Sequence, residues 1–130
     1  MIVLVDTSVW VDHLRRRDRA LETVLENGEV AVHPVVVGEL ACGNLPDRAL
    51  VFQLLSELPA APLASNPEVL ALIERRRLMG KGLGFIDAHL LASALLAAPD
   101  AMLLWTRDTA LDGVAAQLGL AFRPGASGLH

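Results

Sequence analysis

The chain has 130 residues, a length that suits one domain built around one hydrophobic core. Hydrophobic residues make up 53% of it, which excludes extensive disorder, and aromatic residues make up only 4%, too few for a surface that stacks single-stranded bases. A net charge of −4 argues against a general DNA-coating protein, whose affinity rests on cations. It is compatible with an enzyme that concentrates acidic side chains at one place.

The single cysteine, Cys42, excludes an internal disulfide and a cysteine-based zinc site, and it fits a reducing compartment. The first residues lack the basic segment of a signal peptide. The longest apolar stretch, residues 86–98, is interrupted by Asp87 and His89 and is too short to span a bilayer. We therefore expect a cytoplasmic protein that does not associate with membranes.

Apolar periodicity and turn residues predict an alternation of strands and helices along the chain. The first half is expected to contain a strand at 2–5, a helix from 7 or 8 to the arginines near 15, a helix around 21–25, a strand at 30–32, and helices at 34–41 and 47–58. The second half is expected to contain a weak strand at 61–64, helices at 66–79 and 86–97, a strand at 101–105, a helix at 111–118 and a short strand at 120–122.

This alternation predicts an α/β fold with a mostly parallel sheet of about four to five strands, covered by helices on both faces. We expect one domain over residues 1–130, with a frayed tail from about residue 124. Thr7 or Ser8 can cap the first helix. The glycine-rich connector at 80–84 lacks the spacing of a nucleotide-binding loop. In such folds ligands bind beyond the carboxyl ends of the strands.

Four acidic residues stand where that ligand-binding edge is expected. Asp6 follows the first strand, Asp108 follows the strand at 101–105, Asp87 lies in the first turn of an apolar helix, and Glu39 interrupts another. Singly, each is explained as a cap, a turn residue or a solvated position. Together, with Arg107 as the only adjacent basic residue, they repel one another unless Mg²⁺ or Mn²⁺ is bound. The set predicts metal-assisted hydrolysis of a phosphodiester.

These residues also resemble the PIN domain. The motifs that carry the resemblance are Val5-Asp6-Thr7-Ser8 after the first strand, Glu39 in the helix from Pro34, Asp87-Ala88 at the start of an apolar helix, and Thr106-Arg107-Asp108 after a late strand. The resemblance spans about residues 1–123, and both the order and the spacing of the motifs match. The short length and the whole-chain match are similar to a VapC-type toxin of a bacterial toxin–antitoxin pair.

The resemblance implies an endoribonuclease that depends on Mg²⁺ or Mn²⁺ and acts as the toxin of a type II pair. It implies that the catalytic and metal-binding acids are Asp6, Glu39, Asp87 and Asp108, with Thr7, Ser8 and Thr106 as supports. It further implies a homodimer and a cognate VapB-like antitoxin that inhibits cleavage. The RNA target is not indicated.

The sequence departs from the PIN pattern at one position. Relatives often carry a further acid where this chain has Ala110. Asp112, one helical turn beyond Asp108, is the candidate to replace that acid through water. The number of metal ions, one or two, is therefore left open.

Three alternative functions use the same residues. A dehalogenase-like phosphatase with Asp6 as nucleophile is disfavoured, because it needs a second aspartate at the position of Ser8. A signalling receiver is disfavoured as well, because it needs an aspartate after the strand at 61–64, where the chain has Ser65-Asn66. An inactive PIN scaffold gains no support, because all four acids are present.

Two basic clusters, at 15–19 and 75–81, either guide an RNA backbone or are solvated helix ends.

Overall fold

The computed structural model describes residues 1–97 and 101–125 and centres on a three-stranded parallel sheet. The strands are β1 (Ile2–Val5), β2 (Val30–Ala31) and β3 (Met102–Trp105), in the order β2-β1-β3. Val3 lies beside Val30 on one side and beside Leu103 on the other. β1 is thus the central strand and is buried from Val3 to Val5, as its continuous apolar run predicts.

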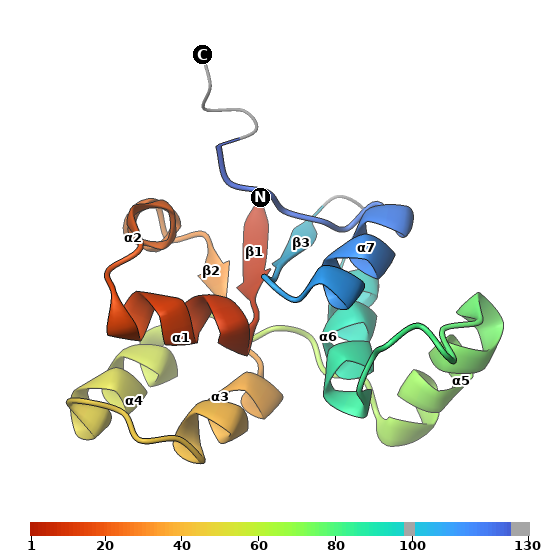
Figure 1. Cartoon of the computed structure of the whole chain (residues 1–130), viewed down its shortest axis with the longest axis horizontal. Coiled ribbons are helices and arrows are strands. Elements are labelled where there is room, and N and C mark those ends of the chain that lie inside the picture. The colour runs from red at the N-terminus through yellow and green to blue at the C-terminus, as the bar shows by residue number, and fades with distance from the viewer. Residues whose placement is uncertain (98–100, 126–130) are drawn as a thin grey trace.

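Helices flank the sheet on both sides. They are α1 (Thr7–Arg15), α2 (Arg19–Glu26), α3 (Pro34–Ala41), α4 (Arg48–Glu57), α5 (Asn66–Arg76), α6 (Phe85–Leu96) and α7 (Thr109–Gln117). α1 to α4 lie on the β2 side of the molecule and α5 to α7 on the β3 side (Figure 1). The predicted α/β fold is confirmed. The apolar helix predicted at 86–97 is α6, and every residue from Leu90 to Ala94 in it is buried.

Two of the predicted strands do not form beyond a single parallel bridge. Around residues 61–64 only Ala60 pairs, with Val32, and around 120–122 only Ala121 pairs, with Leu104. Pro62 and Pro124 follow these bridges and have no backbone N–H with which to extend a ladder. The sheet therefore has three strands with a bridge at each edge, instead of four to five strands.

Several helix ends also differ from the prediction. α5 ends at Arg76 rather than near residue 79, because Arg77 adopts a left-handed conformation with φ of 52° and closes the helix. The cap residue of α1 is Asp6, not Thr7 or Ser8. The predicted tail falls mostly on residues 126–130, outside the described ranges. Within those ranges, no helix is both long and apolar enough to cross a membrane.

Candidate metal centre

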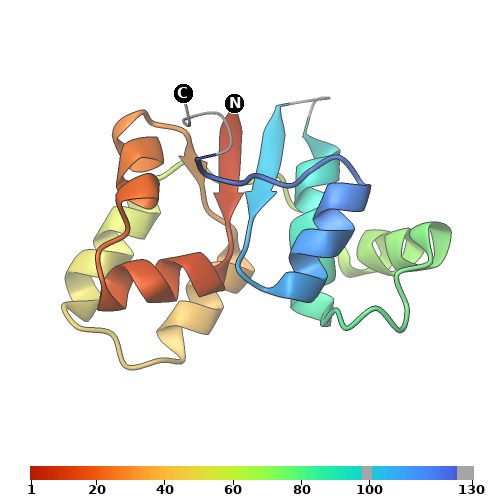
Figure 2. The same ribbon diagram turned by 45° about the horizontal axis from the view of Figure 1, so that its top comes forward.

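The four predicted acids come from four different elements that begin at one end of the molecule. Asp6 joins β1 to α1, Glu39 lies on α3, Asp87 lies in the first turn of α6, and Asp108 joins β3 to α7. Figures 1 and 2 show that the strand arrowheads and the first turns of α1, α3, α6 and α7 lie at this end. It is the carboxyl edge of the sheet, where ligands of parallel α/β folds bind.

Asp6 is the buried member of the set, with 6% of its surface exposed. Its Oδ2 accepts hydrogen bonds from Ser8 Oγ at 2.9 Å and from Thr106 Oγ1 at 2.7 Å. Thr106 Oγ1 accepts the backbone N–H of Asp108 at 3.0 Å, and Ser8 Oγ accepts that of Arg107 at 3.0 Å. The two hydroxyls therefore hold Asp6 and connect the end of β1 to the end of β3.

Glu39 is exposed and lies against the start of α1. Its Oε1 accepts a hydrogen bond from Thr7 Oγ1 at 2.6 Å. Thr7 is the first residue of α1, directly after Asp6, so this contact ties α3 to the same strand end. The predicted supports Thr7, Ser8 and Thr106 thus all contact one of the predicted acids.

The pKa of Asp87 reflects its burial and the negative charges of the other three acids. Burial raises the pKa of its carboxyl group, and the negative charges of Asp6, Asp108 and Glu39 raise it further. A hydrogen bond from the Gly84 backbone N–H to Asp87 Oδ2, at 2.9 Å, works in the opposite direction but does not offset these effects. Asp87 therefore accepts the backbone N–H of Gly84, the cap residue of α6, and is also exposed to the negative charges of the other three carboxylates.

Asp108 likewise has two roles. It is the cap residue of α7, and its Oδ1 accepts the backbone N–H of Leu111 at 3.0 Å. Its negative charge also raises the pKa of Asp87.

Asp112, the predicted substitute for an acid at Ala110, forms an ion pair with Arg123 at 2.7 Å. Its charge is not among those that raise the pKa of Asp87. The supporting role of Asp112 stays a prediction.

The donor set fits a hard divalent cation in chemistry and in charge. All four side chains offer carboxylate oxygens, the ligands that Mg²⁺ and Mn²⁺ prefer, and a cation would relieve the repulsion felt at Asp87. In residues 1–97 and 101–125, however, no three Asp, Glu, His or Cys side chains already surround one point suited to an ion. Each of the four carboxylates accepts hydrogen bonds through one of its two oxygens, and the second oxygen accepts none of them.

Arg107 has partners that the sequence does not indicate. Its guanidinium donates to Asp12 Oδ2 at 2.6 Å and to Asp18 Oδ2, and it lies over the Trp105 ring with Cζ 5.8 Å from the centroid. These two hydrogen bonds raise the pKa of Arg107. Since Asp12 and Asp18 lie 95 and 89 residues away in the chain, no local pattern reveals the pairing. The base next to Asp108 is thus neutralised by other acids.

The chain matches a known protein family over most of its length. The model of the PIN domain family matches residues 3–117, and the chain belongs to that family. Among its relatives, Ribonuclease VapC32 from two strains of Mycobacterium tuberculosis is 45% identical over 120 residues, which cover 92% of this chain and 95% of the relative.

Solved structures share the fold at lower identity. The crystal structure of FitAcB from Neisseria gonorrhoeae matches with a TM-score of 0.62 at 20% identity, covering 96% of this chain and 99% of that one. The crystal structure of PAE2754 from Pyrobaculum aerophilum matches with a TM-score of 0.57 at 16% identity, covering 92% and 96%. At these identities the likeness concerns the fold alone.

Proposed function

We propose that this protein is a Mg²⁺- or Mn²⁺-dependent endoribonuclease that hydrolyses phosphodiester bonds in RNA and acts as the toxin of a type II toxin–antitoxin pair. The observation that carries the proposal is that the carboxylates of Asp6, Glu39 and Asp108, from elements far apart in the sequence, act on the carboxyl group of Asp87. Membership in the PIN family and 45% identity to a relative named a ribonuclease, over nearly the whole of both chains, support it. The protein would act in the cytoplasm, where its RNA substrate is found.

In this proposal Asp6, Glu39, Asp87 and Asp108 hold the metal. A divalent cation held there would activate a water molecule and stabilise negative charge on the phosphodiester oxygens. Ser8 and Thr106 orient Asp6, and Thr7 orients Glu39, through the hydroxyl groups that already donate to these carboxylates. Burial of Asp6 holds its carboxylate in one place, so that little reorganisation is needed when substrate binds.

Cleavage of RNA by the purified protein, freed of any copurifying partner, tests the proposal. We expect cleavage with Mg²⁺ or Mn²⁺ and none in EDTA. Asp6→Asn and Asp87→Asn should each lower the rate at least about 100-fold while leaving the fold intact.

Asp47→Asn is the matched control, because Asp47 is an exposed residue at the start of α4 without a side-chain capping bond. It removes the same charge away from the site and should leave cleavage unchanged. Cleavage that persists in both Asp6→Asn and Asp87→Asn would show that these acids are not catalytic and would refute the proposed site.

The proposal includes a cognate VapB-like antitoxin that blocks this site. A binding partner for four carboxylates is expected to present cationic side chains to them. Adding the separately purified antitoxin to the active enzyme should stop cleavage in proportion to the complex formed. Full cleavage in a stable complex would exclude inhibition by this route.

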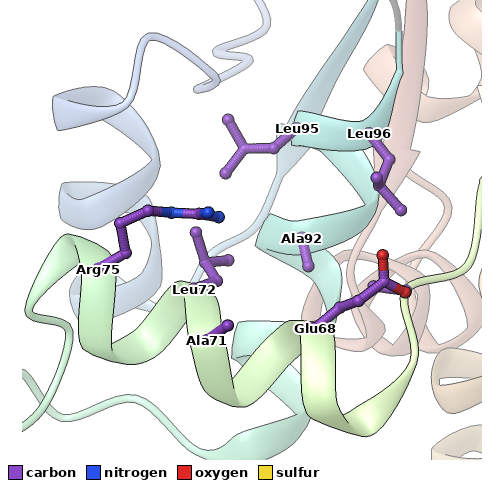
Figure 3. A pocket seen from close by; sticks show the side chains of 8 residues that line it. Glu68, Ala71, Leu72, Arg75, Ala92, Leu95 and Leu96 are labelled. Atoms are coloured by element: carbon purple, nitrogen blue, oxygen red, sulfur yellow. The ribbon is translucent and has the colours of Figure 1, made fainter.

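The proposed homodimer has a candidate surface between α5 and α6. A crevice of about 270 Å³ lies there, with Leu72, Leu95 and Leu96 in its apolar lining. Figure 3 shows Glu68 and Arg75 at its opposite ends. Around it, Leu63, Leu70 and Leu96 expose half or more of their surface.

A two-fold dimer through this crevice is complementary in charge. A two-fold axis between antiparallel copies of α5 would place Glu68 opposite Arg75 of the partner subunit, twice per dimer. We expect Arg75→Glu to turn a dimer into a monomer in sedimentation experiments. Arg76→Glu makes the same change one residue on, outside the crevice lining, and should leave the dimer intact. A monomeric wild type, or equal behaviour of both variants, would contradict this interface.

A further inference from the structure

An RNA strand that reaches the four acids must meet cations on the way, because the chain as a whole carries a net charge of −4. Several arginines are already engaged. Arg17, Arg107 and Arg123 form ion pairs, and Arg48 donates to the backbone carbonyls of Ala41 and Gly43. Within the described residues, the Arg and Lys side chains with neither an ion pair nor one of these backbone hydrogen bonds are Arg15, Arg16, Arg19, Arg75, Arg76, Arg77 and Lys81.

Arg15 is a cation from this set that lines a crevice together with a candidate metal ligand. The crevice, of about 160 Å³, lies between α1 and α3 and is lined by Glu39, Arg15 and Asn44 among mostly apolar side chains. Arg15 is exposed at the end of α1. Its guanidinium is therefore accessible on the Glu39 side of the four acids.

Lys81 is the only lysine in the chain. It belongs to the connector between α5 and α6, which lies on the other side of the molecule from the end of α1 (Figure 1) and contacts the site at two points. The Gly84 N–H donates to Asp87, and a Cβ placed on Gly82 would lie 3.4 Å from Ala110 Cβ, in the first turn of α7. Positive φ values at Gly80 and Gly82, 71° and 80°, fix the path of the chain on both sides of Lys81. Lys81 is thus an exposed cation on a connector whose neighbouring residues contact Asp87 and the first turn of α7.

Arg107 does not compete for this role. It is adjacent to Asp108 in sequence, yet both ends of its guanidinium are held by Asp12 and Asp18. Two of the cations available to a substrate, Arg15 at the end of α1 and Lys81 on the glycine-rich connector, are therefore the ones placed on elements that contact the acids.

We propose that Arg15 and Lys81 bind RNA phosphates on opposite sides of the scissile bond, so that the strand runs from the crevice between α1 and α3 across the four acids to the glycine-rich connector. This inference rests on the proposed ribonuclease function. A guanidinium and an ammonium group contact the backbone without reading the base, so the contacts fix the position of the strand and not its sequence. Selection among RNAs would come from other parts of the surface.

Binding of a short single-stranded RNA, measured by fluorescence anisotropy over a series of salt concentrations, tests this path. All variants are made in the Asp6→Asn background, so that the RNA is not cut. Lys81→Gln and Arg15→Gln should each weaken binding about three- to tenfold. Each should also reduce the slope of log affinity against log salt by about 0.7, the value for one lost phosphate contact on a single strand. The double variant should lose about twice that slope.

Arg19→Gln is the matched control, because it removes one exposed cation from the same basic cluster as Arg15 but from outside the crevice lining, and α2 lies on the other side of the molecule from the connector (Figure 1). Its slope should equal that of the parent protein, and Lys81→Arg should retain binding. If Lys81→Gln and Arg15→Gln bind no worse than Arg19→Gln, the proposed path is wrong even though the protein binds RNA. If the wild type neither binds nor cleaves RNA, the proposed function itself fails.

Discussion

Replacing Thr106 by valine tests how firmly the hydroxyl groups hold the central carboxylate. Valine keeps the shape of threonine but removes the Oγ1 that donates to Asp6 at 2.7 Å and accepts the N–H of Asp108 at 3.0 Å. Thr106 and Asp6 are each 6% exposed, so water does not easily replace these bonds. A lost bond to a buried charge and an unpaired backbone N–H together cost about 2–4 kcal/mol.

Urea unfolding followed by circular dichroism, in EDTA, measures this cost. A loss of about 3 kcal/mol corresponds to a fall of about 10 °C in Tm for a domain of this size. Ser8→Ala removes the second donor to the same Asp6 oxygen. The double variant should lose more than the sum of the single losses, because it leaves a buried carboxylate with neither hydroxyl donor.

Thr109→Val is the matched control, since Thr109 is exposed at the start of α7. It should change stability by less than about 0.5 kcal/mol. If Thr106→Val costs no more than this control, the hydroxyl does not hold Asp6 and the supporting role of Thr106 is refuted.

Two further predictions concern stability. Asp18 is partly buried, which opposes ionisation, but hydrogen bonds from Arg107 and the Leu21 N–H outweigh this and lower its pKa. The ion pair therefore stabilises the protein above pH 4, and its contribution is lost as the pH falls through the lowered pKa of Asp18. Asp18→Asn keeps a capping side chain and should be less stable than wild type at pH 6, and the difference should shrink as the pH falls below 4 in thermal melts. A difference that does not shrink as the pH falls below 4 would contradict this origin. Gly113→Ala should stabilise the protein by about 0.5–1 kcal/mol, because Gly113 lies inside α7 and the added Cβ would meet no neighbouring atom within 4 Å. Gly82→Ala should destabilise it, because Gly82 has a φ of 80° and its added Cβ would lie close to Ala110. Equal shifts in their urea midpoints would show that backbone strain at Gly82 is negligible.

The strands and helices that position the acids are largely predictable because their signals are local. The run Ile2–Val5 is β-branched and apolar, and it forms the buried central strand. Pro34 begins α3, and Asp87 and Asp108 follow the ends of predicted elements. The two outer strands were over-predicted, because a short apolar segment does not show how far it pairs when a proline follows it.

The contacts that assemble the site are harder to predict, because they join residues distant in the chain. The bond between Thr7 and Glu39 and the pairing of Arg107 with Asp12 and Asp18 depend on the packing of whole helices. Local sequence patterns also do not predict that Asp87 and Asp108 have two roles. Both accept a hydrogen bond at the start of a helix, and both belong to an acidic cluster. Each position satisfies an ordinary local rule, and only the fold shows that they meet.

Metal binding by the resting protein tests the central claim most directly, because it does not depend on knowing the RNA. Titration with Mn²⁺ or Mg²⁺, followed by calorimetry and by thermal melts, should give saturable binding to the wild type. It should also give a stabilisation of about 2.7 kcal/mol at a hundredfold excess over Kd. Asp87→Asn should weaken metal binding at least about tenfold, because an uncharged ligand attracts a divalent cation less strongly. Asp47→Asn should leave metal binding unchanged. No binding by the wild type, or equal binding by wild type and Asp87→Asn, would contradict a metal centre at these four acids.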